Sequence, residues 1–331
     1  MLLFLSLLYS IAMRIRNLLY DCSLFRSFSV NVPVVSIGNI TVGGTGKTPL
    51  VQCLAKEALR RGYCCGVVAR GYKGMIRDGT FLNDEGLHLS RSVPGLVMAQ
   101  NPDRVAAAKS IIAEKNVNFI LIDDGFQHRR LKRDLNIAVI DATLPFGYDR
   151  VLPAGLLREP LCGLNRADFL IISRCDQVKP QDLDVISARL QSLAPGVPVF
   201  KSAHTPQNLV KVSASEKRNP ETLRSYKIFA FSGIANPAAF EETLLSLGAE
   251  LTGSRTYPDH YEYRPDDIQA INEQAYNSGA EMIVTTSKDG GKLSSLEGAQ
   301  DMWILDVALR LLDEESRFWN LIFPKDGYHS D

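Results

Sequence analysis

A glycine-rich turn, TVGGTGKT at residues 41–48, restricts the folds open to this sequence more than any other segment. It follows the apolar run VPVVSIGNI, whose length and composition are typical of a buried strand. After it, residues 47–61 place Leu50, Val51 and Leu54 on one face and charged residues on the other, which predicts an amphipathic helix. A strand, a glycine turn and a helix in this order are the context of a phosphate-binding loop, or P-loop.

The residues of this turn suit a nucleotide polyphosphate. Glycines let backbone N–H groups approach phosphate oxygens, and the N-terminus of the following helix adds partial positive charge. Lys47 would reach the outer phosphates, and the Thr48 hydroxyl would ligate Mg²⁺. Thr41 stands at the first glycine position of the consensus G-x-x-x-x-G-K-[ST]. We predict that one continuous segment holds the nucleotide: Thr41, Val42, Gly43, Gly44, Thr45, Gly46, Lys47 and Thr48.

Apolar runs of strand length alternate with stretches of helical period along much of the chain. Runs such as CGVVAR, NFILIDD, NIAVIDA and DFLIISR are typical of a parallel sheet covered by helices. A polar stretch of mixed charge at 210–225 suggests a linker. The predicted class is α/β: a P-loop NTPase-like parallel sheet flanked by helices, with a second, smaller α/β domain and an N-terminal apolar helix. We expect the membrane-associated helix within 1–30, the nucleotide-binding domain at 31–222 and the smaller domain at 223–331.

Acidic residues at strand ends are the candidates for holding the metal ion of a nucleotide site. Asp123 and Asp124 close the run NFILIDD, and Asp141 closes NIAVIDA. In open α/β folds, ligands bind at the carboxyl ends of the strands, so each of these side chains would lie at the expected edge. The residues alone leave the choice among the three carboxylates open.

The overall composition excludes several classes of protein. At about 150 residues per domain, 331 residues make roughly two domains. Lys plus Arg and Asp plus Glu each number 37, so there is no global positive field to hold nucleic acid, and we expect no nucleic-acid partner. The six cysteines lack the paired CxxC spacing of a zinc site and are expected to be reduced thiols.

The N-terminus begins with an apolar stretch, MLLFLSLLYSIAM, followed by Arg14 and Arg16. A cleaved secretory signal would carry its positive charge before the apolar stretch, so cleavage is not expected. The stretch is shorter than the roughly 20 residues that cross a bilayer, which favours an interfacial helix or a short anchor. The basic residues after it place the rest of the chain on the cytoplasmic side of a membrane surface. A helix packed on the protein's own core is the alternative.

Several motifs, in order, resemble those of the tetraacyldisaccharide 4′-kinase family, ATP-dependent lipid A kinases of Gram-negative bacteria. The family usually has Gly before its Asp-Glu pair, where this chain has Asn83. The resemblance covers most of the chain, including the apolar N-terminal helix. The matching blocks are GNITVGGTGKTP, ARGYKG at 69–74, the Asp84–Glu85 pair, DDGFQHRRL, LPAGLLREP at 152–160, PDH at 258–260 and SKD at 287–289.

The resemblance implies transfer of the ATP γ-phosphate to the 4′-hydroxyl of a tetraacylated glucosamine disaccharide 1-phosphate at the inner-membrane surface, forming lipid IVA. It implies that Lys47 and Thr48 serve the nucleotide and Mg²⁺, and Asp123 the metal. Asp84 matches the candidate catalytic base and His260 the partner that orients it. Further matches around the cleft, as candidate substrate residues, are Arg70, Glu85, Gln127, His128, Arg158 and Glu159.

Two other functions are compatible with a P-loop beside an apolar helix. The first is a membrane-associated P-loop ATPase acting as a switch or partitioning protein. Such ATPases typically begin a variant loop with lysine, and this chain has Val42 at that position. The second is a membrane-tethered nucleotide-binding module without catalysis, which would bind ATP but show no acceptor-dependent turnover.

Overall fold

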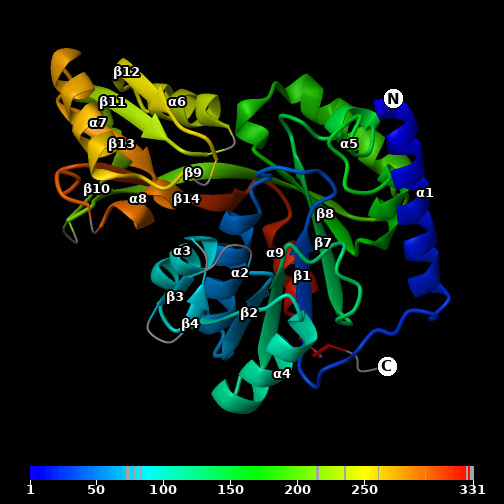
Figure 1. The fold of residues 1–331 in the computed structure, drawn as a ribbon. Coiled ribbons are helices and arrows are strands. Elements are labelled where there is room, and N and C mark those ends of the chain that lie inside the picture. Colours follow the sequence, from blue (N-terminus) through cyan, green and yellow to red (C-terminus); the bar gives the residue numbers. More distant parts are fainter. Residues whose placement is uncertain are drawn as a thin grey trace. The chain divides into compact units, whose positions relative to one another are not determined.

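The computed structural model divides the chain into two compact units, each described by itself (Figure 1). One unit comprises Met1–His204 and Leu309–Asp331, and the other comprises Thr205–Ala308. For residues 75–77, 80–82, 84 and 85 the description covers the backbone. The described ranges are 1–71, 75–77, 80–82, 84–213, 216–234, 236–259, 261–294, 296–325 and 327–328.

The boundary between the units differs from the one expected near residue 222. Two strands, β9 (Val199–Lys211) and β14 (Trp303–Leu311), run from one unit into the other. A boundary inside a strand carries no linker composition, so the sequence gives no sign of it. The polar stretch at 210–225 instead forms the end of β9, the short strand β10 (Lys217–Arg218) and the 3-10 helix η4 (Pro220–Ser225).

A parallel sheet forms the centre of the first unit, which confirms the predicted fold class. Its strand order is β9-β8-β7-β1-β6-β2-β5, and every neighbouring pair is parallel. The central strands are buried along their whole length, which explains their uniformly apolar sequences. The strands besides β9 are β1 (Val34–Gly38), β2 (Cys65–Ala69), β5 (Val97–Gln100), β6 (Phe119–Asp123), β7 (Leu135–Asp141) and β8 (Phe169–Ser173).

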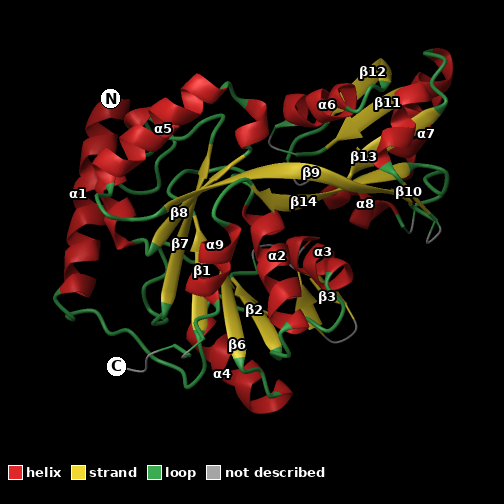
Figure 2. Cartoon of the chain, turned by 180° about the vertical axis from the view of Figure 1, so that it is seen from behind, coloured by secondary structure: helices red, strands yellow, loops and turns green. Residues whose placement is uncertain are grey.

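Helices cover both faces of this sheet (Figures 1 and 2). Alternate strand residues such as Phe119 and Phe169 pack with α2, α3 and α9, while their neighbours Ile120 and Leu170 pack on the other side with α4 and α5. A hairpin of β3 (Met75–Arg77) and β4 (Thr80–Leu82) precedes α3. The helices are α2 (Lys47–Arg60), α3 (Asp84–Ser92), α4 (Arg104–Lys115), α5 (Pro180–Leu193), α9 (Glu315–Ile322), and the short η1 (Gly147–Asp149), η2 (Leu161–Arg166) and η3 (Cys175–Gln177).

The second unit is a smaller α/β structure, as predicted. Its strand order is β12-β11-β13-β14-β9, with β10 antiparallel to β9. Its buried cores contain Phe229, Phe231 and Val284. The further elements are β11 (Lys227–Ser232), β12 (Glu250–Thr256), β13 (Met282–Thr286), α6 (Pro237–Ser246), α7 (Pro265–Asn277) and α8 (Ser287–Leu293).

The N-terminal helix α1 (Leu2–Asp21) turns its apolar side outward. Ser6 is buried, and Tyr9, Arg16 and Asn17 are half-buried against the first unit. The helix is long and apolar enough to cross a membrane, although almost none of it is buried in the protein. It therefore packs on the first unit through polar side chains, unlike the core helix that was the alternative. Its exposed large apolar residues are Met1, Leu2, Leu3, Phe4, Leu5, Leu7, Leu8, Ile11, Ile15 and Leu18.

Candidate functional site

The glycine turn has the backbone of an open loop that ends at a helix N-terminus. Gly43 and Gly46 have φ values of 101° and 79°, which side-chain-bearing residues rarely adopt, and α2 begins at Lys47. The segment 156–158 holds the loop, because Val42 N–H donates to Leu156 O at 2.8 Å and Arg158 N–H donates to Ile40 O at 2.7 Å. The predicted turn is thus present, directly after β1.

Close packing at the end of β1 also requires glycine. A Cβ atom on Gly38 would lie 2.4 Å from the backbone nitrogen of Phe126, which is a prohibitive clash. The segment after β6 therefore passes directly over the strand that feeds the loop. Any larger residue at Gly38 would push the two segments apart.

Lys47 lies between an amide and a carboxylate. Its Nζ donates to Asn39 Oδ1 at 3.1 Å and lies 3.5 Å from Asp124 Oδ1. Asn39 is buried and donates from Nδ2 to Thr41 O at 2.8 Å, so it fixes the first part of the loop as well. Sequence reasoning missed Asn39 as a site residue. Its position between the strand and the glycines was the available signal.

Buried polar groups of the loop fit an anionic ligand. Thr45 is buried, and its Oγ1 has no hydrogen-bond partner among the described residues. A buried hydroxyl without a partner is costly, so this atom is suited to a group that enters from outside. Gly43 is exposed, and a Cβ there would meet no described atom within 4 Å, which leaves open space beside the loop. Thr48 is the second residue of α2 and is half-buried.

The strand-end residues gather at one edge because the strands are parallel. Asp123 pairs in register with Ile37, one residue before the end of β1. Asp141 ends β7, but its carboxylate accepts hydrogen bonds from Thr143 and forms an ion pair with Arg174. Both residues lie on strands that neighbour β1, Asp123 on β6 and Asp141 on β7. The Asp141 carboxylate is engaged by Thr143 and Arg174, and Asp123 stays the predicted metal residue.

Asp124 organises the positive groups around the loop. It has a φ of 51°, and both of its carboxylate oxygens accept from Arg158 NH1 at 2.8 Å. Burial raises its pKa, but Lys47 and Arg158 outweigh that effect, and the net pKa lies below the ordinary value. The carboxylate therefore stays ionised at neutral pH. Its ion pairs make it a counter-ion for the site rather than an open metal ligand.

Arg104 is a further site residue that the sequence did not reveal. It is buried at the start of α4 and donates from NH1 to Asp124 O at 3.0 Å. Burial lowers its pKa, whereas Asp124 and Asp123 oppose that shift. In the sequence it looks like any charged residue at the start of an amphipathic helix.

Glu159 and Gln127 are hydrogen-bonded to each other and, through Gln127, to Asn39 before the loop. Glu159 is fully buried and accepts from Arg166 NH2 at 2.7 Å and from Gln127 Nε2 at 2.9 Å. Gln127 Nε2 also donates to Asn39 O at 2.8 Å. Glu159 is predicted as a substrate residue, and in this structure its buried side chain also holds Gln127 and Arg166 in place.

Arg70 and His128 occupy contrasting surroundings. Arg70 follows the last residue of β2 and is exposed at the carboxyl edge of the sheet, where a ligand could reach it. His128 is half-buried, and burial together with the nearby Arg104 and Arg133 lowers its pKa to about 4. At neutral pH His128 is therefore uncharged.

His204 lies against the glycine turn although sequence reasoning did not select it. A Cβ atom on Gly46 would lie 3.1 Å from its Nε2, and its backbone N–H donates to Asp176 Oδ1 at 3.1 Å. Burial and the nearby Arg174 lower its pKa to about 4. At physiological pH an uncharged imidazole ring therefore lies next to Gly46 of the loop. A lone histidine inside a strand-like run gives no signal of this contact.

The predicted catalytic pair is described only in part. Asp84 is the first residue of α3 and Glu85 the second, and the description of both covers the backbone alone. Because β2 and β5 are parallel, the connection containing α3 must return from the carboxyl edge of the sheet. His260 lies outside the described residues, within the range of the second unit.

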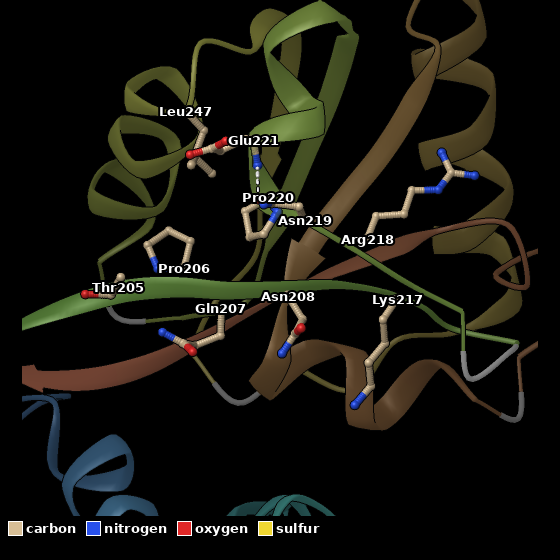
Figure 3. Close-up of a pocket in the computed structure, with 10 residues that line it drawn as sticks. All are labelled: Thr205, Pro206, Gln207, Asn208, Lys217, Arg218, Asn219, Pro220, Glu221 and Leu247. Atoms are coloured by element: carbon tan, nitrogen blue, oxygen red, sulfur yellow. Dashed lines mark hydrogen bonds between the residues drawn. The ribbon is translucent and has the colours of Figure 1, made fainter.

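A groove in the second unit does not contain the predicted site residues (Figure 3). On one side of it, Asn219 Oδ1 accepts from Glu221 N–H at 2.9 Å. Arg218 pairs with Glu216 at 2.8 Å and lies over the ring of Trp303. The residues that line the groove are Thr205, Pro206, Gln207, Asn208, Lys217, Arg218, Asn219, Pro220, Glu221 and Leu247.

Comparisons with known proteins agree with one another. A family model described as tetraacyldisaccharide-1-P 4′-kinase matches residues 1–324. A tetraacyldisaccharide 4′-kinase of Pelobacter propionicus is 38% identical over 321 residues, which cover 93% of this chain and 86% of that protein. Another, of Syntrophus aciditrophicus, is 36% identical, with 97% and 92% covered. A solved structure of LpxK from Aquifex aeolicus in complex with ATP has a TM-score of 0.75 and 28% identity, and 96% of each chain is covered.

Proposed function

Because the chain belongs to the tetraacyldisaccharide 4′-kinase family, we propose that it phosphorylates the 4′-hydroxyl of a tetraacylated glucosamine disaccharide 1-phosphate. It is a kinase of lipid A biosynthesis, with ATP as the phosphoryl donor and Mg²⁺ as the usual partner ion. The observation that carries the proposal is Lys47, held beside an open glycine turn in a chain that matches the family from residue 1 to 324. A switch or partitioning ATPase is not favoured.

In this proposal the turn at 41–48 holds the phosphates of ATP. Backbone N–H groups and the N-terminus of α2 surround the polyphosphate, and Lys47 exchanges its contacts with Asn39 and Asp124 for the outer phosphates. Thr48 and Asp123 would hold Mg²⁺, which neutralises charge on the transferred group. Arg158 and Arg104 keep Asp124 in place while Lys47 moves.

The remaining chemistry is the positioning of the acceptor. Asp84 would accept the proton of the 4′-hydroxyl as its oxygen forms a bond to the γ-phosphorus, and the bond from that phosphorus to the ADP oxygen breaks. His260 would orient the carboxylate of Asp84. Arg70, at the exposed edge, is suited to an anionic part of the substrate. Glu85 would lie next to Asp84 at the start of α3.

We further propose that α1 meets the cytoplasmic face of the inner membrane. Its outward side carries large exposed apolar residues such as Leu8, Ile11 and Ile15, and Arg14 is exposed among them. A helix of this kind gains free energy by lying in the interface of a bilayer. Contact with the membrane raises the effective concentration of an acylated substrate that does not dissolve in water.

An acceptor assay tests this function. Purified full-length protein is mixed with labelled ATP, Mg²⁺ and a tetraacyldisaccharide 1-phosphate in detergent, and label on the lipid is measured. We expect Lys47→Ala to lower kcat/KM by about 10²-fold or more, because it removes phosphate stabilisation. Asp84→Asn should bind ATP normally and transfer slowly. Label released only as inorganic phosphate would contradict the proposal, and equal loss of ATP affinity in both variants would assign Asp84 to the nucleotide.

A further inference from the structure

The polar side of α1 contacts the segments that hold the phosphate loop. Tyr9 OH donates to Arg158 O at 2.8 Å, Arg16 NH2 donates to Gln127 O at 2.6 Å, and Asn17 Nδ2 donates to Glu159 Oε2 at 3.0 Å. These bonds span more than 100 residues of sequence. The helix that exposes its apolar side to the surroundings thus touches, with its other side, the residues around the site.

A continuous chain of hydrogen bonds leads from Asn17 to Lys47. Glu159 accepts from Asn17 on one oxygen and from Gln127 on the other, Gln127 donates to Asn39 O, and Asn39 Oδ1 accepts from Lys47. Most of these bonds join side chains, and the one that ends on the backbone ends at Asn39, the first residue after β1. A shift of α1 would therefore move Lys47 through three intermediate residues, Glu159, Gln127 and Asn39.

Glu159 can pass a movement of Asn17 on to Gln127 because its side chain has little room to change its conformation. Its side chain is fully buried, and a Cβ atom on Gly163 would lie 2.5 Å from its Oε2. A buried carboxylate that loses a donor pays a large desolvation penalty, so it moves toward other donors if one is removed. The nearest are Arg166 and Gln127, and Gln127 is the one that also holds Asn39.

A second branch runs through Arg158. Its carbonyl accepts from Tyr9, its N–H donates to Ile40 O, and its guanidinium holds Asp124, which pairs with Lys47. Both branches start on α1 and end at the same ammonium group. Because both routes, through Glu159 and through Arg158, end at Lys47, the position of α1 affects the position of the Lys47 ammonium group.

We propose that Asn17 and Glu159 are positioning residues for nucleotide binding, through which the seating of α1 on the first unit sets the position of the P-loop lysine. The inference rests on the proposed function, since it takes the turn at 41–48 to bind ATP. The α1 contact that strengthens ATP binding is the one between Asn17 and Glu159, because it leads on to Asn39 and Lys47. α1 is thus a structural part of the nucleotide site in addition to any contact with a membrane.

The test is the ATP affinity of the full-length protein carrying Asn17→Leu, a substitution of similar size that removes the donor and keeps the helix. Because hydrogen bonds to charged groups are worth more than neutral ones, we expect Kd and KM for ATP to rise about fivefold. The kcat at saturating ATP should change less than about twofold, since the reacting groups are intact. Glu159→Gln, which keeps the shape of the side chain, should shift Kd in the same direction.

Ser6→Ala is the matched control. Ser6 lies on the same helix and its buried hydroxyl donates to Val151 O at 2.6 Å, so this variant also removes one α1 contact, but not one in the chain that leads to Asn39. Its ATP affinity should equal that of the unsubstituted protein. An equal weakening by Ser6→Ala and Asn17→Leu would show a general loss of stability and overturn the proposal.

A double-mutant cycle separates this inference from the proposed function. If Asn17 acts through Glu159 and Gln127, the effects of Asn17→Leu and Gln127→Ala on ATP affinity should be non-additive. Unsubstituted protein that does not bind ATP refutes the proposed function itself. Unsubstituted protein that binds ATP, with an Asn17→Leu variant that binds it equally well, refutes the positioning role alone.

Discussion

Lys47 is restrained before any phosphate reaches it. Asn39 and Asp124 hold its ammonium group, and Arg158 and Arg104 in turn hold Asp124. When an anion enters, the lysine exchanges one set of oxygens for another and does not have to be ordered from solvent. Pre-organisation of this kind lowers the entropic cost of binding. It also gives a reason for the carboxylate of Asp124 beside a loop that is proposed to hold an anion.

Substitution of single residues tests which of the strand-end carboxylates binds Mg²⁺. Asp123→Asn should raise the Mg²⁺ concentration needed for half-maximal activity by about tenfold or more, because a carboxylate next to the loop is lost. Asp141→Asn is the control, since Arg174 and Thr143 already occupy Asp141. It should lower stability and leave the Mg²⁺ requirement within about twofold. Titration of activity with Mg²⁺ measures both, and the reverse result would place the metal at Asp141.

At this scale the sequence predicted the continuous turn, but it missed some of the residues that only the fold brings close to the turn. The turn at 41–48 lies where it was predicted, directly before a helix. Arg104 and His204 are distant in sequence and reach the site through α4 and β9. The role of Glu159 could not be predicted either, because a buried carboxylate and an exposed one look alike in a sequence.

Among the elements, α1 has its apolar side chains facing outward and polar side chains facing the protein, which is the reverse of a core helix. A helix packed on a soluble protein usually buries its apolar residues, but α1 exposes them and buries Ser6. The length and composition of the stretch alone predicted an apolar helix. The direction of its apolar side follows from Tyr9, Arg16 and Asn17, whose partners lie elsewhere in the first unit.

Replacing two outward residues of α1 tests its role as an element. Leu8→Gln with Ile11→Gln should weaken binding to vesicles containing anionic lipid by about tenfold or more, since each residue loses part of its apolar transfer free energy. ATP affinity in detergent should not change, because neither residue contacts the site through a described hydrogen bond. Vesicle co-sedimentation measures the first quantity. Val185→Gln, at an even more exposed apolar position on α5, is the control, and an equal loss there would indicate non-specific adsorption.

The strands were the most predictable elements, and the unit boundary was the least. Strands buried on both faces of a parallel sheet are apolar throughout, so β6, β7 and β8 are visible in the sequence. β9 and β14 pass from one unit to the other without interruption. A polar turn within the second unit resembles a linker more than either strand does, which explains the expectation of a boundary near 222.

For the whole molecule, two half-buried histidines link folding stability to pH. His128 and His204 each have a pKa of about 4, lowered from 6.5 by burial and by nearby arginines. Between pH 6.5 and 4 the unfolded chain binds protons that the folded chain does not. The stability that these residues contribute is therefore complete above pH 6.5 and is lost as the pH falls towards 4.

Urea unfolding at pH 7.5 and at pH 5 tests this linkage. We expect a loss of at most about 2 kcal/mol per histidine across the interval, beyond the contribution of the carboxylates. A variant with His128→Gln and His204→Gln should lose less stability between the two pH values than the unsubstituted protein. Equal losses in both proteins would mean that the two rings are already protonated near pH 6.5 in the folded state.

The division of the chain between its two units has a consequence for biosynthesis. In the segment after residue 308, Phe323 packs with Phe119 of the central sheet and Phe318 packs with Phe169. The first unit therefore completes its core only after the whole second unit has been synthesised. During translation, the outward-facing apolar helix leaves the ribosome before the strands of the sheet, and the residues that close the core leave after the second unit. In that interval the aromatic side chains of the sheet, such as Phe119, are not yet covered by Phe323 and are open to chaperones.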